Sequence, residues 1–229
     1  MGIELFVFDL AGTTVRDNKD VHRVLKDTME IFGISISIEE ANEVMGIPKP
    51  EAIKLLLQDK NYPGISPELI SHIHIEFVER MTSFYKNDAG VGEKEGVTET
   101  FLALKHLGIK VAVDTGFNRQ ITDPLLDRLG WKRNKLIDAS VTSDEVDHGR
   151  PFPDLIYRAM HLTGVSDVKK VVKVGDTPSD LHEGTKAGCK WVVGVTSGAF
   201  SRTQLELEPH THLIDQIPDL LQILEMSPI

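Results

Sequence analysis

Short apolar runs recur along the chain and alternate with helical patterns. Residues 3–8 form a mostly apolar run that stops at Asp9, as in a strand buried on both faces of a parallel sheet. Similar runs follow at residues 110–114, 136–141, 171–174 and 191–195, with helical patterns between them, for example at residues 97–107 and 153–162. This alternation predicts an α/β fold, with a Rossmann-like three-layer α/β/α core built on a parallel sheet.

The pattern changes between residues 17 and 86. Residues 21–32, 37–45, 50–57 and 67–84 have helical periodicity, and no strand-like run lies between them. Glycine and proline separate these segments at Gly33, at Gly46 with Pro48, and at residues 61–64 (NYPG). We therefore expect a small α-helical cap domain, residues 16–89, inserted into a core domain made of residues 1–15 and 90–229. Residues 87–92 would form the hinge.

Polar residues and glycines stand where several predicted strands end. The first strand ends in DLAGTT (residues 9–14), the second in DTG (114–116) and a later one in GDTPSD (175–180), while GRP (149–151) precedes the helix before that later strand. Open parallel sheets bind ligands at the carboxyl ends of their strands. The pattern therefore predicts one site that these four segments share.

These four segments resemble, in order and spacing, the signature motifs of the haloacid dehalogenase superfamily, and the resemblance covers essentially the whole predicted core. It implies that Asp9 attacks phosphorus and forms an aspartyl-phosphate, which water later hydrolyses. Taken singly, the same residues have simpler interpretations. Asp176 with Thr177 could cap a helix, and Arg150 could form a surface salt bridge.

The resemblance also implies a Mg²⁺ cofactor and a set of phosphate donors. Oxygen ligands for Mg²⁺, the last acting through the metal's waters, are expected from Asp9, the carbonyl of Ala11, Asp176 and Asp180. Donors to the phosphoryl oxygens are expected from Gly12, Thr13, Thr115 and Gly116. Arg150 is expected to place a fixed positive charge beside the nucleophile and the phosphoryl group.

Residue 11 departs from the pattern of most phosphatases in this superfamily, which carry a second aspartate there as general acid. Here the residue is Ala11, and a positioned general acid is worth roughly 10²–10⁴ in rate. The phosphonatases, which cleave the carbon–phosphorus bond of phosphonoacetaldehyde, have alanine at this position. The segments DLAGTTV (9–15), TGF (115–117), GRP (149–151) and VGDT (174–177) resemble their motifs. The resemblance implies cleavage of phosphonoacetaldehyde or a related small phosphonate.

In phosphonatases a cap lysine forms a Schiff base with the substrate aldehyde, and MGIPK (residues 45–49) matches its pattern, which makes Lys49 the candidate catalytic lysine. Pro50 predicts that Lys49 is not helical and lies at the mouth of a helix beginning at Pro50. The helix dipole would then lower the pKa of Lys49. Two family residues differ, because the histidine three residues later is Ala52 and the second-motif tyrosine is Phe117.

Two alternatives stay open. In the first, the chain is a phosphatase of a small phosphate ester or acyl phosphate, similar to phosphoglycolate phosphatases, and Lys49 merely binds substrate. Lys49 taken alone could also be a solvated residue of the cap's specificity loop. In the second, the chain is a non-catalytic phosphate sensor, which the intact acidic residues at 9, 176 and 180 disfavour.

The composition and charge of the chain limit the kinds of binding partner to expect. A net charge of −10 argues against nucleic acid, and no apolar stretch approaches membrane-spanning length. The single cysteine excludes an internal disulfide, and residue 1 leads into the first strand without the features of a signal peptide. We expect a cytoplasmic monomer or homodimer that acts on a small molecule. Lys173 is expected only to flank the last motif, and residues 210–212 to lie at the surface.

Overall fold

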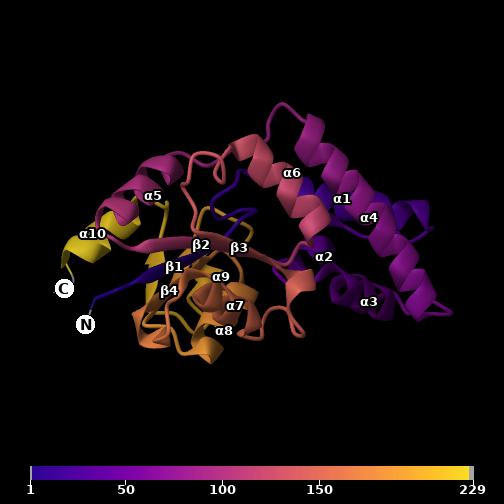
Figure 1. Ribbon diagram of the computed structural model, residues 1–229. Coiled ribbons are helices and arrows are strands. Elements are labelled where there is room, and N and C mark those ends of the chain that lie inside the picture. The colour runs from indigo at the N-terminus through magenta and orange to yellow at the C-terminus, as the bar shows by residue number, and fades with distance from the viewer. Residues whose placement is uncertain (1, 227–229) are drawn as a thin grey trace.

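The computed structural model describes residues 2–226, and its centre is one sheet of six parallel strands in the order β3-β2-β1-β4-β5-β6 (Figure 1). The strands are β1 (Leu5–Asp9), β2 (Lys110–Thr115), β3 (Ala139–Thr142), β4 (Val171–Gly175), β5 (Trp191–Val195) and β6 (His212–Ile214). This order is that of a doubly wound sheet, in which the order of the strands reverses between β1 and β4 while all strands stay parallel. The predicted parallel α/β fold is confirmed.

Alternate residues of β1 point to opposite faces of the sheet, and this makes the core three-layered. Phe6 and Phe8 belong to the large apolar cluster that also contains Phe101, whereas Leu5 and Val7 pack in a second cluster with residues of α7. All five residues of β1 are buried, which explains why its sequence is continuously apolar up to Asp9.

Helices cover both faces of this sheet. They are α5 (Val97–His106), α6 (Arg119–Leu129), α7 (Asp154–Thr163), α8 (Pro178–Ala187), α9 (Arg202–Leu205) and α10 (Asp219–Met226), with short 3₁₀ turns at Ser143–Glu145 and Val168–Lys170. Helix α7 packs against β1, β2 and β3, and α8 packs against β4 and β5. Helix α8 begins with a capping box between Thr177 and Asp180, which fixes Asp180 at the start of the helix.

Four helices between β1 and β2 form a separate group beyond the carboxyl ends of the strands (Figure 1). They are α1 (Asp20–Ile31), α2 (Ile38–Glu43), α3 (Lys49–Asp59) and α4 (Pro67–Asn87). Ser37 and Ser66 cap α2 and α4 through their hydroxyl groups. The long helix α4 packs against α1 and α3 and also against α6 of the core. The helical group therefore faces the edge of the sheet where Asp9 ends β1.

Some boundaries differ from the sequence predictions. Strand β3 begins at Ala139, so residues 136–138 are not part of it. The sixth strand was not predicted, because it is only three residues long and begins in a polar segment. His212 opens this strand, and its ring packs edge-on against Trp191 at 5.1 Å, so it is not a free surface residue.

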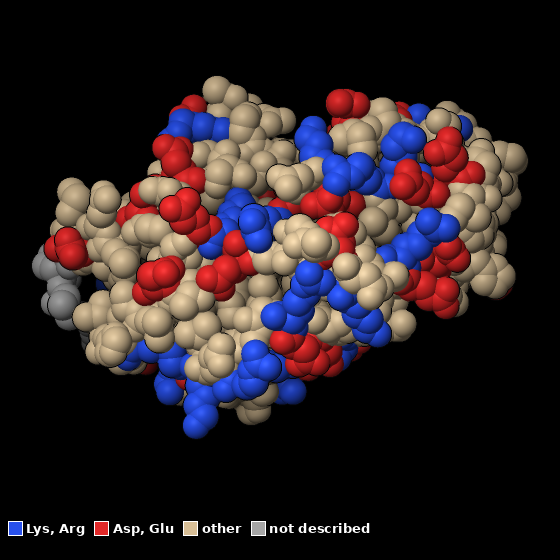
Figure 2. All heavy atoms as spheres, turned by 90° about the horizontal axis from the view of Figure 1, so that it is seen from above, with Lys and Arg blue, Asp and Glu red and all other residues tan. Residues whose placement is uncertain are grey.

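The charged surface and the helix lengths bear on possible nucleic-acid and membrane partners. Basic and acidic side chains are interspersed over the face that Figure 2 shows, without a large area of one sign. Within residues 2–226, no helix combines the length and the apolar character that crossing a bilayer requires.

Candidate active site

Asp9 ends β1 beside Asp114 of β2 in the register of the sheet, and Arg150 binds both carboxylates. The Arg150 Nη1 atom donates to Asp9 Oδ1 at 2.7 Å, and Nη2 donates to Asp114. The guanidinium also lies 2.8 Å from Asp180 Oδ1 and 3.1 Å from Glu183 Oε2, and its side chain is buried. Arg150 therefore gathers carboxylates from β1, β2 and α8 around one positive charge, rather than forming a surface pair.

Two of these carboxylates, those of Asp9 and Asp180, form a candidate cation site together with the carboxylate of Asp176. Oxygen atoms of Asp9, Asp176 and Asp180 lie within 4.8 Å of one another, and all three residues are buried. Burial, opposed by Arg150 and reinforced by Asp180 and Asp176, raises the pKa of Asp9 to about 8. Burial and the charge of Asp180 raise the pKa of Asp176 to about 6. Without a cation, the cluster thus resists full ionisation, and a divalent ion would reverse this effect.

The Asp176 carboxylate is held in place from two sides. Thr13 Oγ1 donates to its Oδ1 at 2.8 Å, and the backbone N–H of Ala199 donates to its Oδ2 at 2.6 Å. Gly12 and Gly198 leave the space it needs, since a Cβ atom at either position would lie within 2.3 Å of Oδ2. A buried, oriented set of oxygen donors of this kind fits a hard divalent cation such as Mg²⁺.

Some of the expected phosphate donors line the cavity, whereas the side chain of Thr13 binds another residue. Ala11, Thr115 and Gly116 line the same cavity as Asp9 and Arg150. Gly12 adopts a φ of +87°, which turns the chain sharply after β1. Thr13 uses its hydroxyl group on Asp176, so its side chain orients a carboxylate in this structure. Thr115 Oγ1 accepts a hydrogen bond from the backbone N–H of Phe117, and its own hydroxyl proton can still be donated into the cavity.

The expectation that Lys173 only flanks the site is wrong. Its side chain is fully buried in β4, and its ammonium group pairs with Asp114, with Glu183 at 2.9 Å and with Asp180 at 3.2 Å. Glu183 of α8, which the sequence analysis did not single out, completes this network. A charged residue inside an otherwise apolar buried strand was the available signal, because such a charge must be paired.

The segment 45–49 of the helical group rests directly on the loops of the core. Gly46 has a φ of +81°, and a Cβ atom there would lie 2.2 Å from Thr177 Oγ1. Pro48 lies over Gly149, where a Cβ atom would come within 2.4 Å of the proline ring. These close approaches need glycine on one side of each contact. They hold Lys49 at the wall of the cavity that contains Asp9.

Lys49 is buried, and its side chain is only 5% exposed. Burial lowers the pKa of its amine to about 8, although Asp17 and Asp9 oppose this shift. The predicted direction is therefore right, but burial rather than the helix dipole is the main cause. The prediction that Lys49 precedes the helix is wrong, because α3 begins at Lys49 and Pro48 is its N-cap. Proline at the second helical position needs no intrahelical donor, so the first turn tolerates Pro50.

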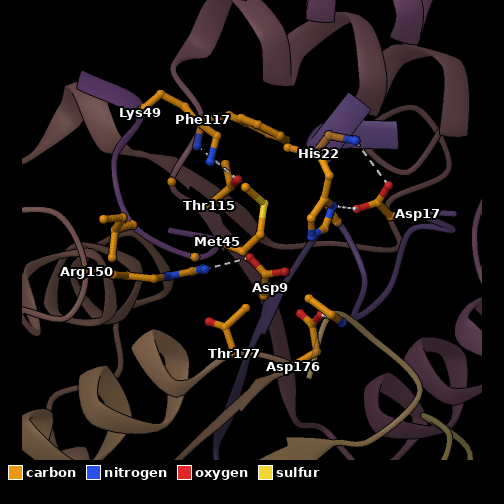
Figure 3. A pocket seen from close by; sticks show the side chains of 16 residues that line it. Asp9, Asp17, His22, Met45, Lys49, Thr115, Phe117, Arg150, Asp176 and Thr177 are labelled. Carbon is orange, nitrogen blue, oxygen red and sulfur yellow. Dashed lines mark hydrogen bonds and ion pairs between the residues drawn. The ribbon is translucent and has the colours of Figure 1, made fainter. Parts of the chain in front are cut away.

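Helix α1 contributes a residue that the sequence analysis missed. His22 lines the cavity, is 2% exposed and lies near Asp17, with 3.9 Å between His22 Nδ1 and Asp17 Oδ2. Figure 3 shows its ring reaching into the cavity on the opposite side of Asp9 from Arg150. The only sequence signal was one polar residue on the buried side of an amphipathic helix, which does not by itself distinguish a site residue from a core residue.

These features define a class of protein: an α/β protein with a buried cluster of carboxylates, including Asp9, at the carboxyl ends of its parallel strands. The family model described as haloacid dehalogenase-like hydrolase matches residues 6–194. The chain belongs to this family. Phosphonoacetaldehyde hydrolase from Bacillus cereus is 34% identical over 225 residues, which cover 91% of this chain and 82% of that protein. Within the family, the chain therefore belongs to the phosphonatase-like branch.

Solved structures agree on the fold. A hydrolase from Pseudomonas syringae superposes with a TM-score of 0.87 at 21% identity, covering 99% of this chain and 100% of that one. A phosphonoacetaldehyde hydrolase-like protein from Oleispira antarctica gives a TM-score of 0.84 at 23% identity, covering 99% and 92%.

Proposed function

We propose that this chain is a Mg²⁺-dependent hydrolase that cleaves the carbon–phosphorus bond of phosphonoacetaldehyde or a related small phosphonate. The observation that carries the proposal is that one cavity holds the Asp9 carboxylate and the Lys49 amine, with alanine at position 11. An alkyl–phosphorus bond has no leaving oxygen for a general acid at position 11 to protonate. It needs an electron acceptor on the carbon side instead, and an amine that forms an imine supplies one.

The phosphorus side of the reaction uses the core residues. Asp9 attacks phosphorus and becomes the aspartyl-phosphate, while Arg150 holds the carboxylate in position through its 2.7 Å hydrogen bond. Asp9, Asp176 and Asp180, with the carbonyl of Ala11, would hold Mg²⁺. When bound, this ion supplies positive charge that offsets the charge on the phosphoryl oxygens. Thr115 and Gly116, at the cavity wall, donate hydrogen bonds to the phosphoryl group.

The carbon side of the reaction uses Lys49. Its amine, with a pKa of about 8, is neutral in a useful fraction of molecules near neutral pH. The neutral amine adds to the aldehyde and, with uptake of one proton and loss of water, forms a protonated imine. When Asp9 attacks, the electron pair of the carbon–phosphorus bond moves towards the iminium nitrogen. The resulting enamine takes up a proton at carbon and is hydrolysed, which frees Lys49.

The cavity is small, about 40 Å³, so there is room for roughly three water-sized groups. We further propose that residues 16–89 move as a cap on the core, residues 1–15 and 90–229, with residues 87–92 as hinge. A small substrate would enter when segment 45–49 lifts from Thr177 and Gly149, and closure would exclude water from the phosphoryl-transfer step.

Borohydride trapping tests the proposal. Phosphonoacetaldehyde and borohydride should alkylate Lys49, as located by peptide mass spectrometry, and Lys49→Ala should lose both the adduct and phosphate release. Lys54→Ala is a matched control, because Lys54 is on the same helix, forms an exposed pair with Glu51 and does not line the cavity. Absence of an adduct on Lys49 in the native chain would reject imine chemistry.

A second candidate is a phosphatase for a small phosphate ester or acyl phosphate that uses Asp9 without an imine. Two observations favour it: Phe117 brings no hydroxyl group to the cavity, and the buried residue Ala52 carries no proton-transfer group. An acyl phosphate has a good leaving group and needs little help from position 11. Phosphate release from such compounds that survives Lys49→Ala would support this candidate, with Asp9→Ala as the blank.

A further inference from the structure

We propose that His22 is the proton-transfer residue for imine formation and hydrolysis at Lys49; this inference rests on the proposed function above. His22 is on α1, 2% exposed, and lines the cavity together with Lys49 and Asp9. In Figure 3 these three side chains enter the cavity from different directions, and the His22 ring points towards Asp9. The carbonyl oxygen of a bound aldehyde would therefore lie among Lys49, His22 and the core.

One ring nitrogen of His22 is already used. Nε2 lies 2.8 Å from the side-chain oxygen of Asn42, which can only accept, so Nε2 carries the hydrogen. In the neutral ring, Nδ1 then has a free lone pair. This atom is buried and has no hydrogen-bond partner among the described residues, and the carboxylate oxygen Asp17 Oδ2 lies 3.9 Å from it. A buried, unpartnered ring nitrogen at a cavity wall is available to a ligand.

The surroundings of His22 suit a group that gains and loses a proton. Burial lowers the pKa of the ring, so that Nδ1 is a base, while Asn42 and Asp17 oppose the shift and favour the protonated form. Burial also raises the pKa of Asp17. Asp17 accepts hydrogen bonds from the backbone N–H groups of Asp20 and Val21, which fixes its carboxylate beside the first turn of α1. Asp17 is thus a positioning residue for the His22 imidazolium.

The proton balance of imine formation defines what His22 does. The Lys49 ammonium has three N–H protons, the iminium product keeps one, and the other two leave with the carbonyl oxygen as water. Nδ1 takes a proton from the ammonium, and the nitrogen lone pair then attacks the carbonyl carbon. His22 passes the first proton to the oxygen, and it repeats the transfer with the second as the C–O bond breaks. Imine hydrolysis reverses these steps.

Another histidine provides a matched comparison. The pKa of His74 is lowered mainly by burial and also by the charge of Lys49, so His74 is near this lysine as well. However, His74 lines a different groove, on the outer side of α3 and α4, together with Pro50 and Lys54. It does not line the cavity that holds Asp9. His74 therefore shares proximity to Lys49 with His22 but lacks access to the substrate.

The test measures imine formation apart from phosphoryl transfer. Asp9→Ala blocks cleavage, so the imine of phosphonoacetaldehyde on Lys49 accumulates and can be trapped with borohydride at timed intervals. In this background we expect His22→Gln, which retains a side-chain amide near the Nε2 position, to slow adduct formation by roughly 10²–10⁴-fold. His74→Gln in the same background should keep the rate of the Asp9→Ala parent. Circular dichroism and thermal melting establish that each variant folds.

The outcomes separate the two proposals. An adduct in the Asp9→Ala parent that forms equally fast in His22→Gln would overturn the role of His22 and leave the proposed function standing. No adduct in the parent would overturn both. If His22→Gln does not fold, His22→Ala with added imidazole replaces it: a rate that rises with imidazole concentration supports the role, and a slow rate that imidazole does not change contradicts it.

Discussion

The Nζ atom of Lys49 lies 5.8 Å from the centre of the Phe117 ring and 5.9 Å from that of Phe77. The two aromatic faces attract the ammonium form of the lysine, whereas burial favours the neutral amine. The pKa of Lys49, lowered to about 8, makes both forms accessible near neutral pH. The proposed chemistry needs both, because the ammonium form binds an anionic phosphonate and the neutral form attacks its aldehyde.

The pKa of Lys49 predicts how imine formation depends on pH. With a pKa of about 8, roughly one tenth of the amine is neutral at about pH 7 and nine tenths at about pH 9. The initial rate of borohydride-trapped adduct formation should therefore rise about tenfold over this interval and then level off. An amine with the ordinary lysine pKa would show no plateau below about pH 10, and that result would contradict the effect of burial.

Loss of the Asp176 charge should weaken magnesium binding. Asp176→Asn keeps the size of the side chain and its acceptor oxygen, but it removes one negative charge from the cluster with Asp9 and Asp180. Isothermal titration calorimetry should show Mg²⁺ affinity falling by at least about tenfold, or about 1.4 kcal/mol. Asp147→Asn is the control, since Asp147 is exposed in a loop and is not one of the clustered carboxylates. Equal affinities for Asp176→Asn and the native chain would contradict the assignment of the cation site.

Arg150 should matter for stability as well as for activity. Arg150→Met leaves four carboxylates with only the Lys173 charge among them, and removing one partner of a buried ion pair costs about 3–5 kcal/mol. Urea unfolding should show a loss of this size. The exposed pair between Arg80 and Glu76 provides the comparison, because Arg80→Met should change stability by less than about 1 kcal/mol. Similar losses in both variants would argue against a buried network.

Gly46 should control the closed arrangement of the helical group on the core. Gly46→Ala places a methyl group 2.2 Å from Thr177 Oγ1 at a residue with a φ of +81°, so segment 45–49 must move away. We expect kcat for phosphonoacetaldehyde to fall by about tenfold or more, while stability changes by about 1–2 kcal/mol. Gly64→Ala is the control for positive φ alone, because its φ is +76° and no atom lies within 4 Å of the added methyl group. Equal kcat values for the two variants would contradict the role of the Thr177 contact.

The sequence predicted the parts of the fold that local patterns encode. Among the described residues, apolar runs identified five of the six strands, and periodicity identified the four helices α1 to α4 of the helical group. It could not predict β6, because a strand of three residues forms through pairing with β5 and not through its own propensity. The start of α3 at Lys49 was also missed. A residue before proline is usually not helical, and here packing of the segment against the core overrides that preference.

By itself, the sequence determined which groups stand at the ends of the strands, because covalent order and the apolar runs place Asp9, Thr115 and Asp176 there. Tertiary structure alone decided how those groups are charged and what joins them. Lys173, Glu183 and His22 entered the site because burial forces ionisable groups to find partners, and the partners come from other elements. Such pairings depend on distances across the fold, which no local pattern of residues contains.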